Sequence, residues 1–363
     1  MSITIGITIA NDTPLANSLF SNGISQNILF LHDLLTTVGY NCLLVTYKPE
    51  DNQSVELGGK NYTAYTLQEV LDNNIHLDAC LEIGMSLRNN NRQVIREHMG
   101  TRIAAISYGH VMIHDMEQII YSHGIESEIR HGKVDRVWAS PHFASTFSYL
   151  STLFHAPVRM APYIWEPRFI HGQPFTAADH QAQPTIRIME SNLSIMKNSI
   201  IPLTIVESIC RTQPDIFSKC FVNNAKSWSE NTYFLKNMLK NMPWLGSRAQ
   251  KVEFGPRNSF AQNFAKRDIL LSHQMMCELN YLYLEALHLN VPLVHNSPRL
   301  KDVGYYYEDC DIDQGREAVT NAIKDQNIEA NAIRGREFVK QFSINNPLNQ
   351  LGYKELIEEL MAH

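Results

Sequence analysis

The stretch from Glu278 to Pro298, with the short apolar run at 268–273 before it, restricts the fold of this chain most. Apolar residues follow Glu278 at the spacing of one helix face, at positions 279, 282, 283, 286, 287 and 289. A second apolar run at 292–295 then stops at Asn296, Ser297 and Pro298. Strand, helix and strand within about thirty residues predict a βαβ unit of a parallel sheet.

This unit also predicts where a ligand would bind. In parallel sheets, ligands lie outside the carboxyl ends of the strands and next to helix N-termini. Glu278 and Asn280 begin the predicted helix, and Asn296 and Ser297 end the following strand, so all four should lie at one edge of the sheet. The alternative is a solvated helix on which Glu278 and Glu285 are ordinary surface residues.

The pattern Glu278…Glu285-Ala-Leu…Val-Pro-Leu-Val resembles the donor-binding motif of GT-B glycosyltransferases. The resemblance implies an α/β fold with two Rossmann-like βα domains facing across a cleft. It also implies that Glu285 holds the donor ribose and that Glu278 lies near the donor sugar as a catalytic-site residue. Six residues separate the two glutamates where the common retaining pattern has seven, and one residue of slip turns a helical side chain by about 100°. Asn290 stands where the family usually has Gly, and Asn also tolerates left-handed backbone.

Composition limits the classes of protein that fit. A chain of 363 residues favours two domains, and a net charge of −6 argues against a nucleic-acid partner bound through a general basic surface. The six cysteines show no paired short spacing and are typical of free thiols in a reducing compartment. We see no signal-peptide pattern and no run of about eighteen apolar residues. The expectation is a cytoplasmic protein with at most peripheral membrane contact.

The N-terminal residues predict a β-loop-α-β opening. Isoleucines alternate with small residues at 3–9, helical spacing follows at 24–38, and a second strand is expected at 42–47. The long first loop carries Asn22 and Gly23, and in GT-B enzymes the corresponding loop approaches the donor phosphates. No Gly-x-Gly-x-x-Gly follows the first strand, so a dinucleotide cofactor is disfavoured.

His110 is the second catalytic candidate. It follows Gly109 at the expected carboxyl end of a strand, where active sites of open sheets lie. Histidine can accept a proton near neutral pH, and GT-B enzymes often use a sugar-contacting His or a general base from this domain. The alternative is a histidine that is hydrogen-bonded within its own loop. The strands expected in this half lie at 79–83, 103–107, 136–139 and 158–161.

A polar, Pro-bearing stretch at 166–184 is the expected linker. It separates an N-terminal, acceptor-side domain at 1–165 from a donor-binding domain at 185–345. A final helix at 346–363 could pack back on the first domain, as is common in GT-B proteins. Further elements expected in the second domain are strands at 185–189, 217–223 and 251–254 and helices at 200–209 and 231–245.

The loop between the strand at 185–189 and the helix at 200–209 predicts a phosphate site. It carries Asn192 and Lys197, and a helix N-terminus beside a lysine attracts anions. GT-B enzymes place a basic residue near this position against the donor pyrophosphate; the alternative is an exposed loop lysine. Arg257 follows the strand at 251–254 and could bind the nucleobase or the phosphate.

Together these features predict a glycosyltransferase that moves a sugar from a nucleotide-sugar to a hydroxyl acceptor. The pyrophosphate would lie near Lys197 and Ser297, and the acceptor would be a glycan or lipid-linked molecule, for example in surface glycan synthesis. The resemblance implies a fold that usually needs no metal, so neither a metal nor another cofactor is expected. Retention or inversion of the anomeric carbon stays open. The alternatives are a nucleotide-sugar epimerase of the same fold, a non-catalytic two-domain sugar- or nucleotide-binding protein, and an inactive transferase subunit.

Overall fold

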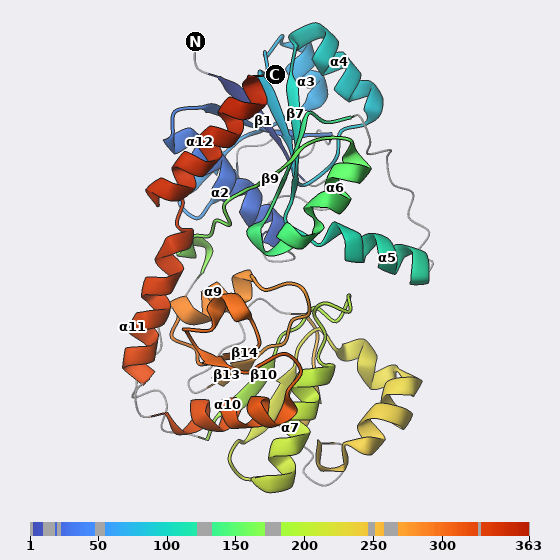
Figure 1. Cartoon of the computed structure of the whole chain (residues 1–363), viewed down its shortest axis with the longest axis vertical. Coiled ribbons are helices and arrows are strands. Elements are labelled where there is room, and N and C mark those ends of the chain that lie inside the picture. Colours follow the sequence, from blue (N-terminus) through green and yellow to red (C-terminus); the bar gives the residue numbers. More distant parts are fainter. Residues whose placement is uncertain are drawn as a thin grey trace. The chain divides into compact units, whose positions relative to one another are not determined.

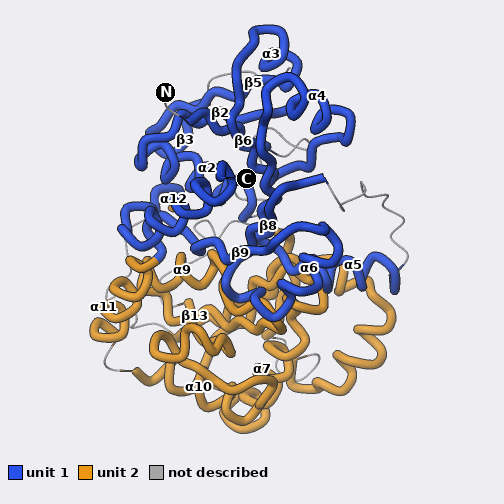
Figure 2. Tube along the Cα trace, turned by 45° about the horizontal axis from the view of Figure 1, so that its top comes forward, with its two compact units in different colours: residues 1–169, 342–363 blue, residues 170–341 orange. Residues whose placement is uncertain are grey.

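The computed structural model describes residues 3–9, 19, 23–47, 55–121, 133–170, 183–245, 251–257, 268–325 and 328–362. They form two compact units (Figure 2). Unit 1 comprises Met1–Phe169 and Phe342–His363, and unit 2 comprises Ile170–Gln341. Each unit contains a parallel sheet with its own helices, so the α/β fold class is confirmed (Figure 1).

The sheet of unit 1 has seven parallel strands in the order β5-β2-β1-β6-β7-β8-β9. The central strands are apolar, as expected where neighbours cover both faces, and β6 and β8 are buried at every residue. Their bounds are β1 Thr4–Thr8, β2 Asn41–Thr46, β5 Ala64–Thr66, β6 Ala79–Glu82, β7 Arg102–Ser107, β8 Arg136–Ala139 and β9 Val158–Met160. An antiparallel hairpin, β3 Val55–Leu57 with β4 Lys60–Tyr62, precedes β5.

The last helix of the chain belongs to unit 1. Tyr353 on this helix is fully buried, and its hydroxyl donates to the carbonyl oxygen of Pro162 at 3.0 Å. The hydroxyl of Tyr108 lies 2.9 Å from that of Tyr353. The helices of unit 1 are α2 Gly23–Thr37, α3 Leu67–Asp72, α4 Asn89–Met99, α5 Val111–Tyr121, α6 Phe147–Phe154 and α12 Pro347–Met361.

The sheet of unit 2 has six parallel strands in the order β12-β11-β10-β13-β14-β15. The predicted βαβ unit is confirmed as β13, α9 and β14. The strands are β10 Thr185–Ile188, β11 Lys219–Val222, β12 Val252–Phe254, β13 Asp268–Leu271, β14 Leu293–His295 and β15 Tyr305–Tyr306. The helices are α7 Ile200–Thr212, α9 Tyr281–His288, α10 Ile312–Lys324 and α11 Ile328–Val339.

The sequence predicted a helix at 231–245, and this prediction was wrong. The segment instead holds a π-helical turn, Phe234–Met238, and a 3₁₀ turn, Leu239–Asn241. Asn231 Oδ1 accepts from Phe234 N at 2.9 Å, as the oxygen of an N-cap does, whereas Asn241 Nδ2 donates to Asn237 O at 2.6 Å and so competes with the backbone for that carbonyl. Apolar spacing alone did not reveal this competition.

Each sheet has a point where its strand order reverses. In unit 2 the chain moves outward from β10 through β11 to β12, then returns to β13 on the other side of β10. Loops that leave neighbouring strands in opposite directions open a crevice at the carboxyl ends, which is where doubly wound sheets bind ligands. The crevice of unit 2 lies between the ends of β10 and β13. Among the described residues, no helix combines the length and apolar character needed to cross a membrane.

Candidate functional site

The start of α9 is fixed by Asn280. This residue has extended backbone, and its Oδ1 accepts a hydrogen bond from Leu282 N at 3.2 Å, so it is the N-cap of the helix. An N-cap asparagine is favoured because it satisfies one of the backbone donors that a helix start leaves unpaired. In this structure its side-chain oxygen therefore holds the helix, and its contact with a ligand stays a prediction.

Glu278 and Ser297 lie together at the carboxyl edge of the sheet. Ser297 Oγ donates to the backbone oxygen of Glu278 at 2.6 Å, which joins the loop after β13 to the loop after β14. The Glu278 carboxylate pairs with Arg299, whose Nε lies 2.6 Å from Oε2. Sequence reasoning missed Arg299, although a basic residue two positions after Ser297 was a visible signal. The arrangement gives this edge both a carboxylate and a guanidinium.

Asn296 is occupied by backbone groups. Its Oδ1 accepts from Gln274 N at 2.9 Å, and its Nδ2 donates to Gln274 O at 2.8 Å and to Asp309 O at 3.2 Å. The residue is buried and ties the loops after β13 and β15 to the end of β14. Its geometry is that of a structural clamp, so its expected ligand contact stays a prediction.

Glu285 lies on the second turn of α9 and is half-buried. Burial raises the pKa of its carboxyl to about 8, because nothing in the surroundings compensates for the lost water. Within the described part of the chain, this carboxyl makes no hydrogen bond or ion pair. A half-buried carboxyl without a hydrogen-bond partner in the protein is suited to accept hydrogen bonds from a ligand.

Residues 191–199 form the Lys197 loop, which connects β10 to α7. Asn192 closes this loop: its Oδ1 accepts from Ser199 N at 2.8 Å, and its N donates to Lys197 O at 3.0 Å. Asn192 has a left-handed φ of 55°, a conformation that asparagine tolerates well. Its amide thus shapes the loop, and a direct ligand contact by Asn192 stays a prediction.

Two polar groups of the Lys197 loop have no protein partner among the residues that the structure describes. The half-buried Lys197 ammonium forms no ion pair or hydrogen bond there. The Oγ of the fully buried Ser199, which precedes the first residue of α7, accepts and donates nothing. A lysine and an unpaired hydroxyl at a helix N-terminus make a site suited to an anion.

Glu190 is the site residue that sequence reasoning missed. It follows β10, is 1% exposed, and accepts hydrogen bonds from Ser272 Oγ and, at 3.0 Å, from His273 N at the end of β13. Burial raises the pKa of its carboxyl to about 7, against the opposing effect of these bonds and of Lys197. The only signal in the sequence was an acidic residue directly after a buried strand.

The two histidines nearest this crevice are neutral. Burial lowers the pKa of both His273 and His295 to about 4. His295 Nδ1 accepts from Ser297 N at 3.1 Å, and its Nε2 therefore donates to Val303 O at 2.9 Å. His273 Nδ1 lies 3.0 Å from the Tyr307 hydroxyl. Both rings support loops and add no positive charge at neutral pH.

The remaining candidates are more isolated. Arg257 follows β12 and is exposed, and the residues directly after it lie outside the described ones. Gly23 is the exposed first residue of α2 in unit 1, and Asn22 also lies outside the described residues. His110 is 3% exposed and accepts from Ile113 N at 3.3 Å in the first turn of α5. That geometry favours the structural alternative for His110, and its role as a base stays a prediction.

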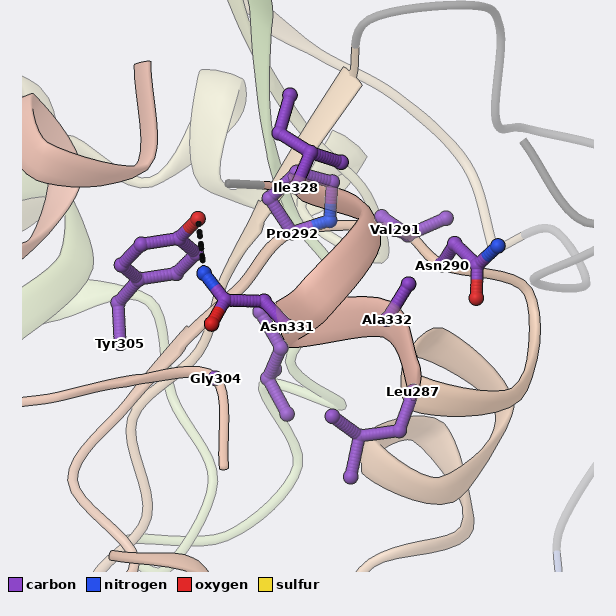
Figure 3. Close-up of a pocket in the computed structure, with 10 residues that line it drawn as sticks. Leu287, Asn290, Val291, Pro292, Gly304, Tyr305, Ile328, Asn331 and Ala332 are labelled. Atoms are coloured by element: carbon purple, nitrogen blue, oxygen red, sulfur yellow. Dashed lines mark hydrogen bonds between the residues drawn. The ribbon is translucent and has the colours of Figure 1, made fainter. Parts of the chain in front are cut away.

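Among the described residues of unit 2, two pockets are considered as ligand sites. The first, at the amino ends of β14 and β15, is lined by Asn290, Gly304, Tyr305 and Asn331 among others (Figure 3). The cavity of about 30 Å³ is too small for a sugar, because ligand pockets are usually about ten times larger. The second has a volume of about 410 Å³ and apolar walls. It is lined by Ile200, Trp228, Asn231, Tyr233, Phe234 and Met238.

Metal ligands do not gather in the described part of the chain. No three His, Cys, Asp or Glu side chains there are placed to hold one ion. Metal independence of any reaction stays a prediction. The groups available for ligand chemistry are therefore Lys197, Ser199, Glu190, Glu285 and the Glu278–Arg299 pair.

Comparison with solved structures places the fold. This protein matches the pneumococcal O-GlcNAc transferase GtfA, solved in complex with UDP and GlcNAc, with a TM-score of 0.56 and 8% identity. The match covers 100% of each chain. It matches sucrose-phosphate synthase from Thermosynechococcus elongatus over 99% of each chain, with a TM-score of 0.60 and 10% identity. TarM matches with a TM-score of 0.59 and 9% identity, over 100% of this chain and 99% of TarM.

The protein thus has the GT-B fold of glycosyltransferases, with two Rossmann-like domains, as the sequence resemblance implied. Within that class it belongs to the DUF2827 family, described as "Protein of unknown function", whose family model matches residues 5–357. No curated protein matches the chain.

Proposed function

We propose that this protein is a glycosyltransferase that moves a sugar from a nucleotide-sugar to a hydroxyl acceptor. The observation that carries the proposal is a pair of groups without protein partners, on segments that follow the neighbouring strands β10 and β13 of unit 2. These are the Lys197 ammonium before α7 and the Glu285 carboxyl on α9. A nucleoside diphosphate has the matching chemistry, because its phosphates attract a cation and its ribose hydroxyls can donate to the oxygen of a carboxyl group.

Each group has a role in this proposal. Lys197, Ser199 and the N-terminus of α7 bind the diphosphate, and Glu285 accepts hydrogen bonds from the ribose. Glu278 lies near the donor sugar, where Arg299 balances its charge. The GT-B fold and the UDP present in the GtfA structure support a nucleotide as the ligand.

The chemistry would be a displacement at the anomeric carbon. The acceptor oxygen forms a bond to that carbon while the bond to the diphosphate breaks, and the diphosphate leaves with the electron pair. The acceptor proton passes to a base, for which His110 is the sequence-based candidate. The transition state has oxocarbenium character, as in glycoside hydrolysis, and positive charge beside the diphosphate stabilises the leaving group. The proposed acceptor is a glycan or a lipid-linked molecule, and the proposed reaction needs no metal.

The test is thermal unfolding with UDP, GDP, TDP, CMP and ADP, each at millimolar concentration. A ligand at one hundred times its dissociation constant stabilises the fold by about 2.7 kcal/mol, which raises the midpoint by several degrees. Lys197→Met should weaken the active nucleotide roughly 10- to 100-fold, because a charged hydrogen bond contributes about 1.5–3 kcal/mol.

Lys219→Met is the matched control. Lys219 is the first residue of β11 and so lies at the amino ends of the strands, away from the proposed site. Its Nζ forms an exposed ion pair with Glu253 Oε1 at 2.5 Å. Its loss should leave nucleotide binding unchanged. If no nucleotide shifts the wild-type midpoint, or if Lys197→Met and Lys219→Met behave alike, the proposed function is wrong. The two-domain binding-protein interpretation predicts nucleotide binding without transfer to any acceptor.

A further inference from the structure

Glu190 places an acidic group inside the proposed diphosphate site. We propose that Glu190 takes up a proton when a diphosphate binds beside Lys197, and that it thereby couples donor binding to pH as a positioning residue. This inference rests on the proposed function, because it takes the Lys197 loop as the anion site.

The carboxyl of Glu190 is held rigidly at the crevice. Its Oε1 accepts hydrogen bonds from Ser272 Oγ and from His273 N. These bonds join the residue after β10 to the residues after β13. Its backbone oxygen accepts from Asn224 Nδ2 at 2.9 Å, which adds the end of β11. With 1% of its surface exposed, Glu190 cannot turn out to water when its surroundings change.

Lys197 is the cation that acts on Glu190, and it stabilises the ionised carboxylate. The other groups that face it carry no charge at neutral pH. His273 after β13 is neutral because burial lowers its pKa to about 4. Tyr283 on α9 and Tyr307 after β15 stay protonated because burial raises the pKa of each well above 10. The charge of Glu190 therefore depends first on burial, then on the bonds from Ser272 and His273, and least on Lys197, which is the one of these influences that a bound anion can reach.

A bound diphosphate changes this balance. It balances the charge of Lys197, which removes part of the support for the carboxylate, and its own negative charge repels an ionised Glu190. Both effects favour the protonated carboxyl. Burial already brings the pKa of Glu190 to about 7, so a small further rise leads to proton uptake near neutral pH. By linkage, a site that binds its ligand best when protonated loses affinity as the pH rises.

The expected size follows from one titrating group. If Glu190 is protonated in the complex throughout, the wild-type dissociation constant rises by about tenfold per pH unit once the pH exceeds 7. Between pH 6.5 and 8.5 the wild type should therefore lose at least about tenfold in affinity that a neutral replacement does not lose. The step moves one proton from solvent to Glu190, with no bond to carbon or phosphorus changed.

The experiment titrates the full-length wild type and Glu190→Gln with UDP and with inorganic pyrophosphate by calorimetry, from pH 6.5 to 8.5. Glutamine keeps an oxygen for Ser272 and His273 but cannot ionise. The ratio of the two dissociation constants at each pH cancels the protonation of the ligand itself. Glu253→Gln is the control, because Glu253 is an exposed acid of unit 2 at the surface of β12.

The expected result is a ratio that grows about tenfold or more across the range, while Glu253→Gln follows the wild type. Wild-type titrations with inorganic pyrophosphate, which has no ribose to contact Glu285, in two buffers of different ionisation enthalpy should show proton uptake by the protein once the protonation of free pyrophosphate is subtracted. This measurement also decides the matter if Glu190→Gln does not fold. If the ligands bind but the dissociation constants of wild type and Glu190→Gln change with pH in parallel, and no proton is taken up, this inference is wrong and the proposed function still stands. Absence of binding of either ligand to the wild type overturns it together with the proposed function.

Discussion

Replacing Glu285 with Gln should stabilise the protein, and the gain should grow with pH. The carboxyl of Glu285 is half-buried without a partner in the described structure, and burial raises its pKa from 4.5 to about 8. Between these values the folded protein keeps a proton that the unfolded chain has released. Stability contributed by this group is complete below about pH 4.5 and is lost as the pH rises towards 8.

The size of the effect can be worked out at pH 7. Each pH unit between the unfolded pKa and the working pH costs about 1.4 kcal/mol, and roughly 2.5 units separate 4.5 from 7. The cost is therefore about 3 kcal/mol at most, and the Glu285→Gln variant avoids it because an amide does not ionise. For a domain of this size, that corresponds to a rise in midpoint of roughly 6 to 12 °C.

The assay is urea unfolding of wild type and Glu285→Gln at pH 5, 6, 7 and 8, followed by tryptophan fluorescence. The difference between the two curves isolates Glu285, because Glu190 titrates equally in both proteins. Glu253→Gln, an exposed control, should stay parallel to the wild type. Parallel curves for Glu285→Gln from pH 5 to 8 would refute the reasoning, since they would mean that water reaches this carboxyl.

Two further predictions concern a glycine before β15 and a buried ion pair in unit 1. Gly304→Ala should cost roughly 3 kcal/mol in unfolding free energy, because Gly304 has a φ of 69° and an added Cβ would lie 2.6 Å from Leu293 O. Gly39→Ala, with a φ of 102° and no atom within 4 Å of the new Cβ, should cost only about 1 kcal/mol, and equal costs would contradict the clash. Arg92→Met should cost about 3–5 kcal/mol in urea unfolding, because it leaves buried Glu82 without the bonds of 2.7 and 2.6 Å that it now accepts. Adding Glu82→Met should recover most of that loss, and a double variant no more stable than Arg92→Met would show that packing dominates.

The sequence revealed the sheets because buried parallel strands are nearly continuous apolar runs. The runs at 79–83 and 136–139 correspond to β6 and β8 almost residue for residue. The hairpin β3–β4 was not predicted, although Gly58-Gly59 at its turn has the positive φ values, 58° and 78°, that such a dipeptide allows. Its strands of three residues are too short for a periodic pattern.

The sequence predicted several residues of the candidate site, but it predicted their roles less well. Glu278 and Ser297 meet as the strand ends indicated, but Asn280, Asn296 and Asn192 hold backbone groups. Asparagine serves caps, turns and ligands equally well, so its type cannot separate these uses. The function of Glu190 depends on its contact with Ser272, which lies 82 residues away in sequence at the end of another strand, and no local pattern records such a contact.

Unit 1 is built from two separate segments of the chain, and this has a consequence for biosynthesis. Its chain is interrupted after Phe169 by the whole of unit 2 and resumes at Phe342, so α12 is made after unit 2. At about 5–20 residues per second, a ribosome needs roughly 10 to 40 s to pass from one segment to the other. During that time unit 2 can emerge and fold, while the place of Tyr353 beside Tyr108 and Pro162 stays empty. Nascent unit 1 therefore lacks the contacts of α12 until that helix has been made.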